Sequence, residues 1–215
     1  MRCLEQMPER MRVSHLCGAM ISIRGRSPRW ILGLILLTAT TGCSIRSLAV
    51  RSLADSLAGG GDVWASDEDP ELVRDALPFA LKTYESLLVE APDHDELLLA
   101  TCAGFTQYAS AFVEGDALYM EETDWGAAQR LELRAVRLFL RGRDYCLRGL
   151  EGLSPGITRR LQLEPDLATA DLGSEALPLM FWTGASWGSA ISAALDRPEL
   201  VVDLPAVRAL IARAL

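Results

Sequence analysis

Five arginines between residues 130 and 148 form a concentrated set of side chains that could bind an anion. Their spacings of four, three, four and seven residues place them on one face of a helix. They are Arg130, Arg134, Arg137, Arg141 and Arg148. Because guanidinium groups donate paired hydrogen bonds that fit a carboxylate, we expect Arg134, Arg137 and Arg141 to recognise a carboxylate ligand or an acidic partner surface. The alternative is a solvated face paired with neighbouring acidic residues.

Aromatic side chains on several predicted helices form a second candidate site. They are Tyr108, Phe112, Tyr145, Phe181, Trp182 and Trp187. Large rings line apolar ligand channels and oligomer contacts, so we take Tyr108, Tyr145, Trp182 and Trp187 as candidate ligand-binding or contact residues. The alternative is a core built from these rings.

Residues suited to catalysis or metal binding are sparse. After residue 42 the sequence holds one histidine, His94, whereas a metal site normally needs two or more His or Cys ligands. No GxSxG or comparable nucleophile motif accompanies it. The run Gly59-Gly60-Gly61 lacks the lysine of a phosphate-binding loop. We predict no enzyme, no metal ion and no cofactor.

Helices are the regular elements that must position these residues. Apolar residues recur every three or four positions, and no stretch of useful length alternates with a period of two. Pro, Gly and Asp mark the helix ends. The predicted helices span residues 70–90, 93–114, 124–153, 176–195 and 206–215, with a connector starting at Gly115-Asp116. The three-residue break after the first helix favours an antiparallel hairpin, so the predicted fold is an all-α bundle.

Two helix faces carry this prediction. The first helix is expected to bury the row Leu72, Ala76, Phe79, Ala80, Thr83 and Leu87. The longest helix carries small residues where neighbouring backbones would approach, in the row Ala128, Leu131, Ala135, Leu138, Gly142, Tyr145 and Gly149.

The net charge of −8 hides two segments of opposite charge. Residues 1–42 hold six Arg and two Glu, whereas the remainder holds 15 basic and 27 acidic residues. A domain of charge −12 argues against nucleic-acid binding. The basic segment runs into ten apolar residues, WILGLILLTA, and then Thr40-Thr41-Gly42-Cys43. Such a run makes a helix of roughly 15 Å, half of a bilayer core, and is typical of a removed export signal.

The residues around Cys43 resemble the lipobox of bacterial lipoproteins, in which the cysteine is diacylated and becomes the mature N-terminus. Thr40 stands where such motifs usually have Leu. We therefore predict a signal peptide with an N-terminal extension over residues 1–42, with Met20 as an alternative start. Residues 43–66 would hold the lipidated cysteine and a flexible tether, in which Gly59-Gly60-Gly61 prevents continuous structure. Residues 67–215 would form the helical domain.

Cys102 and Cys146 are the two cysteines of this helical domain. An exported compartment permits a disulfide, but the pair would have to face each other across two helices with their Cα atoms within about 7 Å. We expect instead two small buried apolar side chains.

Several strings together resemble one family over about residues 69–215. They are PFALKTYESLLVEAPDHDELLLATCAGFTQYASAFVE, RAVRLFLRGRDYCLRGLE, SPGI and LPLMFWTGASWGSAI. The combination is similar to the T-component (TatT) family of tripartite ATP-independent periplasmic (TRAP) transporters. The resemblance implies TPR-like helix hairpins, a periplasmic lipoprotein that associates with the transporter's solute-binding protein, a possible trimer, and an apolar cleft. Family members continue beyond the position of Leu215, so we expect an incomplete domain with an apolar face that favours association.

Two functional hypotheses follow. In the first, the chain is a lipid-anchored accessory component, with the outer membrane as the expected location, that docks the solute-binding protein and binds a hydrophobic or organic-acid ligand. In the second, it is a TPR-like scaffold or assembly lipoprotein of the cell envelope without a transport role.

Overall fold

A computed structural model describes residues 46–215, apart from the side chain of residue 62. Every regular element in this range is a helix, which confirms the all-α prediction. Residues 1–45 lie outside the described part, so the signal peptide and the lipidation of Cys43 stay predictions. Within the described range, no helix has both the length and the apolarity needed to cross a membrane.

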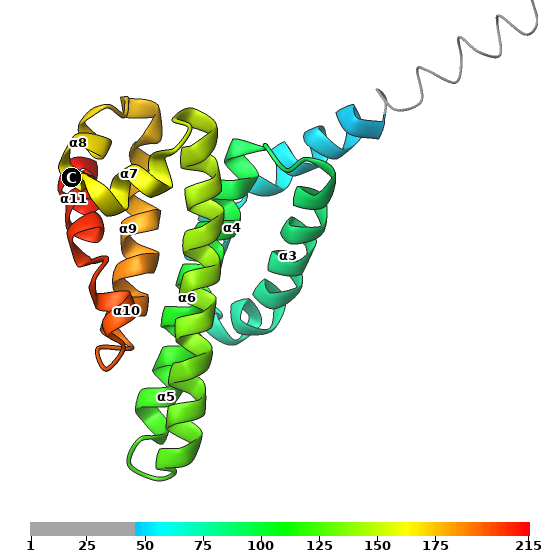
Figure 1. Ribbon diagram of the computed structural model, residues 1–215. Helices are drawn as coiled ribbons and strands as arrows, with labels where there is room; N and C mark the ends of the chain where they lie inside the picture. The colour runs from blue at the N-terminus through cyan, green and yellow to red at the C-terminus, as the bar shows by residue number, and fades with distance from the viewer. Residues whose placement is uncertain (1–45) are drawn as a thin grey trace, which may run out of the picture. The chain divides into compact units, whose positions relative to one another are not determined.

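The elements follow one another through short turns. A helix at residues 46–58 is followed by α2 (Gly61–Ala65), α3 (Pro70–Glu90), α4 (Asp95–Tyr108), a π-helical segment (Ala109–Glu114), α5 (Gly115–Met120), α6 (Trp125–Leu153), α7 (Ile157–Leu163) and α8 (Pro165–Ala170). A 3-10 turn (Ser174–Ala176), α9 (Leu177–Ser192), α10 (Pro198–Val201) and α11 (Leu204–Ala214) complete the chain. The long helices α3, α4, α6, α9 and α11 run alternately up and down, and α6 packs between α4 and α9 (Figure 1).

Side-chain caps set the starts of the main helices. The Asp69 carboxylate accepts hydrogen bonds from the amides of Glu71 and Leu72, both at 3.1 Å, and Pro70 occupies the first helical turn. Asp124 caps α6 by accepting from the Ala127 amide at 2.9 Å. The predicted boundaries of α3 and α6 are therefore confirmed, because their capping residues are local in sequence.

The sequence placed the buried face of α3 wrongly. Phe79 is 79% exposed and Leu72 is 57% exposed, although both belong to the row that was expected to face the core. The buried row is Val73, Leu77, Leu81, Tyr84, Glu85 and Leu88. Periodicity alone cannot choose between two neighbouring rows of α3. Packing decides, because Leu81 fits against Gly104 of α4, where an added Cβ would lie 2.7 Å from Leu81 Cδ2.

Two expected irregular segments are helical. The tether was predicted to lack continuous structure, but residues 46–58 form a helix with Ala54 fully buried, and only Gly59-Gly60 interrupt it before α2. Ion pairs of 2.8 Å, Arg46–Glu90 and Arg51–Asp93, hold this helix against the end of α3 and the turn that follows. The prediction of a connector starting at Gly115-Asp116 is also wrong, because helical backbone continues to Met120.

Cys102 and Cys146 form a disulfide between α4 and α6, which corrects the expectation of two unpaired buried side chains. Their Cα atoms are 5.5 Å apart, and both side chains are fully buried. The two helices approach this closely because Gly142 lies at their contact. A Cβ at Gly142 would lie 3.0 Å from the Cys102 carbonyl oxygen and 3.2 Å from Ser186 Oγ of α9.

We predict that changing both Cys102 and Cys146 to Ala lowers the free energy of unfolding by about 2–4 kcal/mol, since the bridge closes a long loop of the unfolded chain. Denaturant titration measures the loss. Refolding in a reductant should bring the native sequence close to the double variant and leave the double variant unchanged. Equal stability of the native sequence with and without reductant would contradict this role of the disulfide.

We also predict that Gly142→Ala destabilises the protein by about 1–3 kcal/mol, because the disulfide restrains the Cys102 carbonyl that the methyl group would press against. Gly152→Ala is the matched control on the same helix. Its Cβ would meet only Asp95 Oδ1 at 3.7 Å, so the higher helix propensity of Ala should stabilise by up to about 1 kcal/mol. The same sign of change for both variants in urea titrations would refute the tight contact at Gly142.

Candidate functional site

A pocket of about 570 Å³ opens among the helix at residues 46–58, α2, α3, α4 and α9. Aromatic and aliphatic side chains form much of its wall, including Trp64, Leu77, Leu99 and Trp182. Among the four predicted aromatic candidates, Trp182 is the one that lines it. The pocket exists because residues 46–65 fold back onto α3 and α4. This contact was not predicted, because these residues were expected to form a flexible tether.

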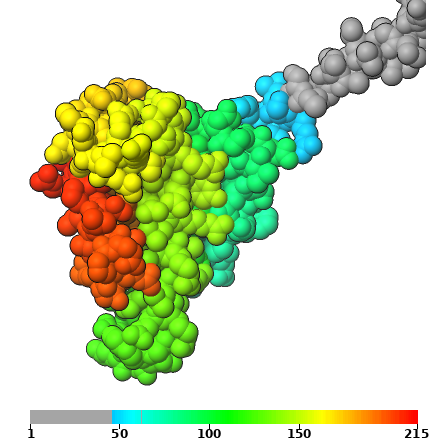
Figure 2. Space-filling view, in the orientation of Figure 1, coloured from blue at the N-terminus to red at the C-terminus, as the bar shows by residue number. Residues whose placement is uncertain are grey.

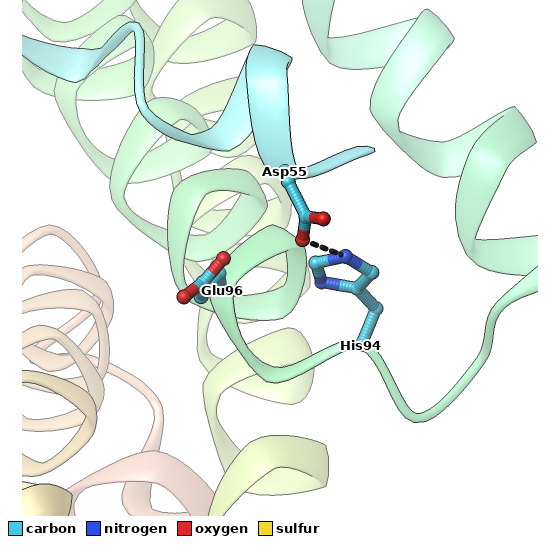
Figure 3. Close-up of side chains that lie close together, drawn as sticks. All are labelled: Asp55, His94 and Glu96. Atoms are coloured by element: carbon cyan, nitrogen blue, oxygen red, sulfur yellow. Dashed lines mark ion pairs between the residues drawn. The ribbon is translucent and has the colours of Figure 1, made fainter. Parts of the chain in front are cut away.

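Three side chains with ligand atoms gather at one side of this pocket: Asp55, His94 and Glu96 (Figure 3). Their nearest ligand atoms lie within 4.8 Å of one another, and Asp55 and Glu96 belong to the pocket lining. His94 is buried, whereas both carboxylates are exposed. Within the described residues, Glu96 makes no ion pair with a Lys, Arg or His side chain.

The hydrogen bonds of His94 fix the position of its proton. Nδ1 accepts from the Leu97 amide at 3.3 Å and so caps α4. The proton of the neutral ring therefore sits on Nε2, which lies 2.9 Å from Asp55 Oδ1 and donates to it. A metal on Nε2 would force this proton onto Nδ1, against the Leu97 amide. Carboxylates and an imidazole have metal-binding chemistry, but the helix cap opposes metal binding here.

A second polar cluster lies between α3 and α6, around the buried carboxylate of Glu85. Its Oε1 accepts from Arg141 Nε at 2.5 Å and from the Tyr145 hydroxyl at 2.8 Å, and Oε2 accepts from Lys82 Nζ at 2.6 Å. Burial by itself would raise the pKa of Glu85, but the hydrogen bonds from Lys82, Tyr145 and Arg141 outweigh it and hold the pKa below its ordinary value. Burial and the bond to Glu85 raise the pKa of Tyr145.

The arginine row is divided by its contacts. Arg141 is bound to Glu85 and lies over the Phe105 ring at 5.0 Å, and Arg148 donates to the Pro92 carbonyl at 2.8 Å. Arg134 lies over the ring of Tyr108 at 5.8 Å and donates to its hydroxyl at 3.4 Å. In the described part of the chain, Arg130 and Arg137 form no ion pair.

The remaining aromatic candidates lie apart from the pocket wall. Tyr145 stacks on Phe105 with ring centroids 6.1 Å apart, and Tyr108 contacts Phe112 with centroids 5.7 Å apart. Trp187 is 1% exposed and lies in the core under the guanidinium of Arg143, at 5.0 Å. The structure thus joins Arg141 with Tyr145 and Arg134 with Tyr108, but does not gather all the candidates into one site.

Sequence reasoning missed Glu85, Asp55 and Glu96. Glu85 is the one buried acidic residue of the described core. It lies twelve residues after Val73 and eight after Leu77, in the buried row of α3, so the sequence could have indicated a buried carboxylate once that row was chosen. Asp55 and Glu96 gave no local signal, because their proximity depends on the long-range packing of residues 46–58.

The fold and the pocket define an all-α helical-bundle protein. The family model of the TRAP transporter T-component matches residues 66–215, and the chain belongs to this family. A relative from Treponema pallidum (strain Nichols), described as an uncharacterised protein, is 38% identical over 134 residues. That match covers 56% of this chain and 42% of the relative, so the chain spans less than half of the relative's length.

We predict that Glu85→Gln lowers the free energy of unfolding at pH 7 by about 1.5–3 kcal/mol, the range for hydrogen bonds to a charged group. Because the folded-state pKa of Glu85 is lowered, its stabilisation is present above the ordinary value of 4.5 and is lost as the pH falls below it. Urea titrations from pH 7 to pH 3 should therefore show the two proteins converging.

The matched control is Glu90→Gln, also on α3, which removes the charge from an exposed pair with Arg46. Exposed pairs contribute about 0–1 kcal/mol. A loss at Glu85 no larger than at Glu90, or one independent of pH, would contradict the importance of the buried carboxylate.

Proposed function

We propose that this chain is a periplasmic lipoprotein that serves a TRAP-type transport system by docking its solute-binding protein. Family membership over residues 66–215 is the observation that carries the proposal. The apolar run before Cys43 supports export and lipid anchoring, with the outer membrane as the proposed location. The Cys102–Cys146 disulfide also supports an oxidising compartment such as the periplasm.

The proposed docking surface is the outer face of the first half of α6, defined by Arg130, Leu133 and Arg137. All three side chains are exposed, and the helical spacing of three and four residues places them together. Arg134 lies at the edge of this face, partly engaged by Tyr108. Since Arg130 and Arg137 have no acidic partner within the described residues, their guanidinium groups are available to carboxylates of another protein.

Exposed aromatic side chains lie next to this surface, on α5 and at the start of α6. Tyr119 is 85% exposed and Trp125 is 58% exposed. Figure 2 shows this end of the molecule, formed by α5 and the start of α6, projecting beyond the neighbouring helices. Exposed aromatic residues beside arginines are typical of protein interfaces, so we include this tip in the docking surface.

The pocket supports a further role in binding a ligand with an apolar body. Its volume of about 570 Å³ and its Trp64 and Trp182 walls suit a small molecule. Of the two ligand classes that the sequence suggested, the hydrophobic one fits better, since Asp55 and Glu96 would repel an organic acid. Trimer formation remains part of the proposal through family resemblance alone.

We predict that Arg137→Glu lowers capture of the solute-binding protein from native membranes by about fivefold or more, since reversing one interfacial charge costs on the order of 1 kcal/mol. Quantitative mass spectrometry of the captured proteins measures the effect. Arg159→Glu, a reversal at an exposed arginine of α7 outside the docking surface, is the control and should leave capture unchanged.

Equal capture by both variants would remove the α6 face from the docking hypothesis. Capture of envelope-assembly proteins with no solute-binding protein would instead favour the scaffold role.

A further inference from the structure

The acidic side of the pocket carries negative charge without a cation to balance it. Asp55 receives a hydrogen bond from His94, but the capped ring is neutral, so this bond brings no positive charge. No Lys or Arg belongs to the pocket lining. Arg51, one helical turn before Asp55, is already paired with Asp93 at 2.8 Å. Two carboxylates therefore face a largely apolar cavity with their charge uncompensated.

The groups that could attract an anion are few at this pocket. The Tyr84 hydroxyl, on the pocket wall, already donates to the Leu57 carbonyl at 3.2 Å. Gln107 offers a neutral amide. An anionic ligand would thus meet two carboxylates and no guanidinium or ammonium group, and like charges at this distance repel.

The same walls suit a cation that is itself partly apolar. The indole rings of Trp64 and Trp182 line the pocket together with Leu77 and Leu99. Aromatic faces attract ammonium groups through their ring quadrupole, and the aliphatic side chains give an alkyl body a place away from water. A bare metal ion would use little of a cavity of about 570 Å³, and the His94 cap opposes its coordination.

We propose that this pocket binds a small organic cation, with an ammonium group held between Asp55 and Glu96 and an apolar body against the indole rings. The inference rests on the proposed ligand-binding role of the pocket and names the ligand class. The pocket and the docking surface would then bind partners of opposite charge. The acidic pocket would bind a cation, and the basic face of α6 would bind acidic side chains of another protein.

The test compares three probes with the same alkyl chain, octylammonium, octan-1-ol and octanoate, by titration calorimetry on the full chain at pH 7. Octylammonium should bind about tenfold more tightly than octan-1-ol, and octanoate should bind most weakly. Glu96→Gln should weaken octylammonium binding about fivefold and leave octan-1-ol binding unchanged, since only the charged interaction is lost.

Asp95→Asn is the matched control. It removes the same charge from the adjacent position in the first turn of α4, but Asp95 does not line the pocket. It should leave the affinity for all three probes unchanged. Because Asp95 and Glu96 are both exposed, the two variants are expected to fold alike, which thermal unfolding checks directly.

Equal binding of octylammonium and octan-1-ol would overturn the cation assignment while preserving an apolar-ligand role. Preferred binding of octanoate, or an equal loss in the Glu96 and Asp95 variants, would overturn it as well. If none of the probes binds, both the cation assignment and the ligand role fail, whereas capture of the solute-binding protein stays a separate result. Stoichiometric binding of Zn²⁺ that Glu96→Gln abolishes, with no binding of octylammonium, would assign the cluster to a metal and overturn the proposal.

Discussion

The close approach of α4, α6 and α9 at Gly142 sets the positions on which the other features depend. The Thr106 hydroxyl bonds the Cys102 carbonyl at 2.8 Å and also contacts the Ser186 hydroxyl. This small-residue contact brings three helix backbones together, and the Cys102–Cys146 bridge restrains two of them. Larger side chains here would separate the helices, because packed interiors leave little free volume.

With this contact in place, α6 presents different chemistry on different sides. On the side toward α3, Arg141 and Tyr145 bind the buried Glu85 carboxylate. These bonds hold α3 against α6. On the outside, Arg130 and Arg137 stay exposed. Helix α9 contributes Trp182 to the wall of the pocket that Glu96 of α4 also lines. A basic docking face and an acidic pocket can therefore coexist in one acidic domain.

Helix positions were the most predictable part of the fold, since caps and breaks depend on neighbours in the sequence. Asp69 and Asp124 mark their helix starts as expected. The buried face of α3 was not predictable in the same way, because Phe79 belongs to a row as apolar as the one that packs. The helix at residues 46–58 was missed because its contacts are with distant parts of the chain. Ala54 is buried in the core formed with α3 and α4, and the exposed ion pairs of Arg46 and Arg51 join residues more than 40 positions apart.

The sequence by itself determined the helical class, the family, and the division between a basic leading segment and an acidic domain, since each depends on composition and local pattern. Only the tertiary structure decided which charges are compensated. Arg141 and Glu85 are 56 residues apart and bind each other, whereas Arg137 is left exposed on the same helix. Asp55 and Glu96 become neighbours only when residues 46–58 pack on α4. Local periodicity shows which residues share a face of a helix. Which other helix that face contacts depends on the tertiary packing.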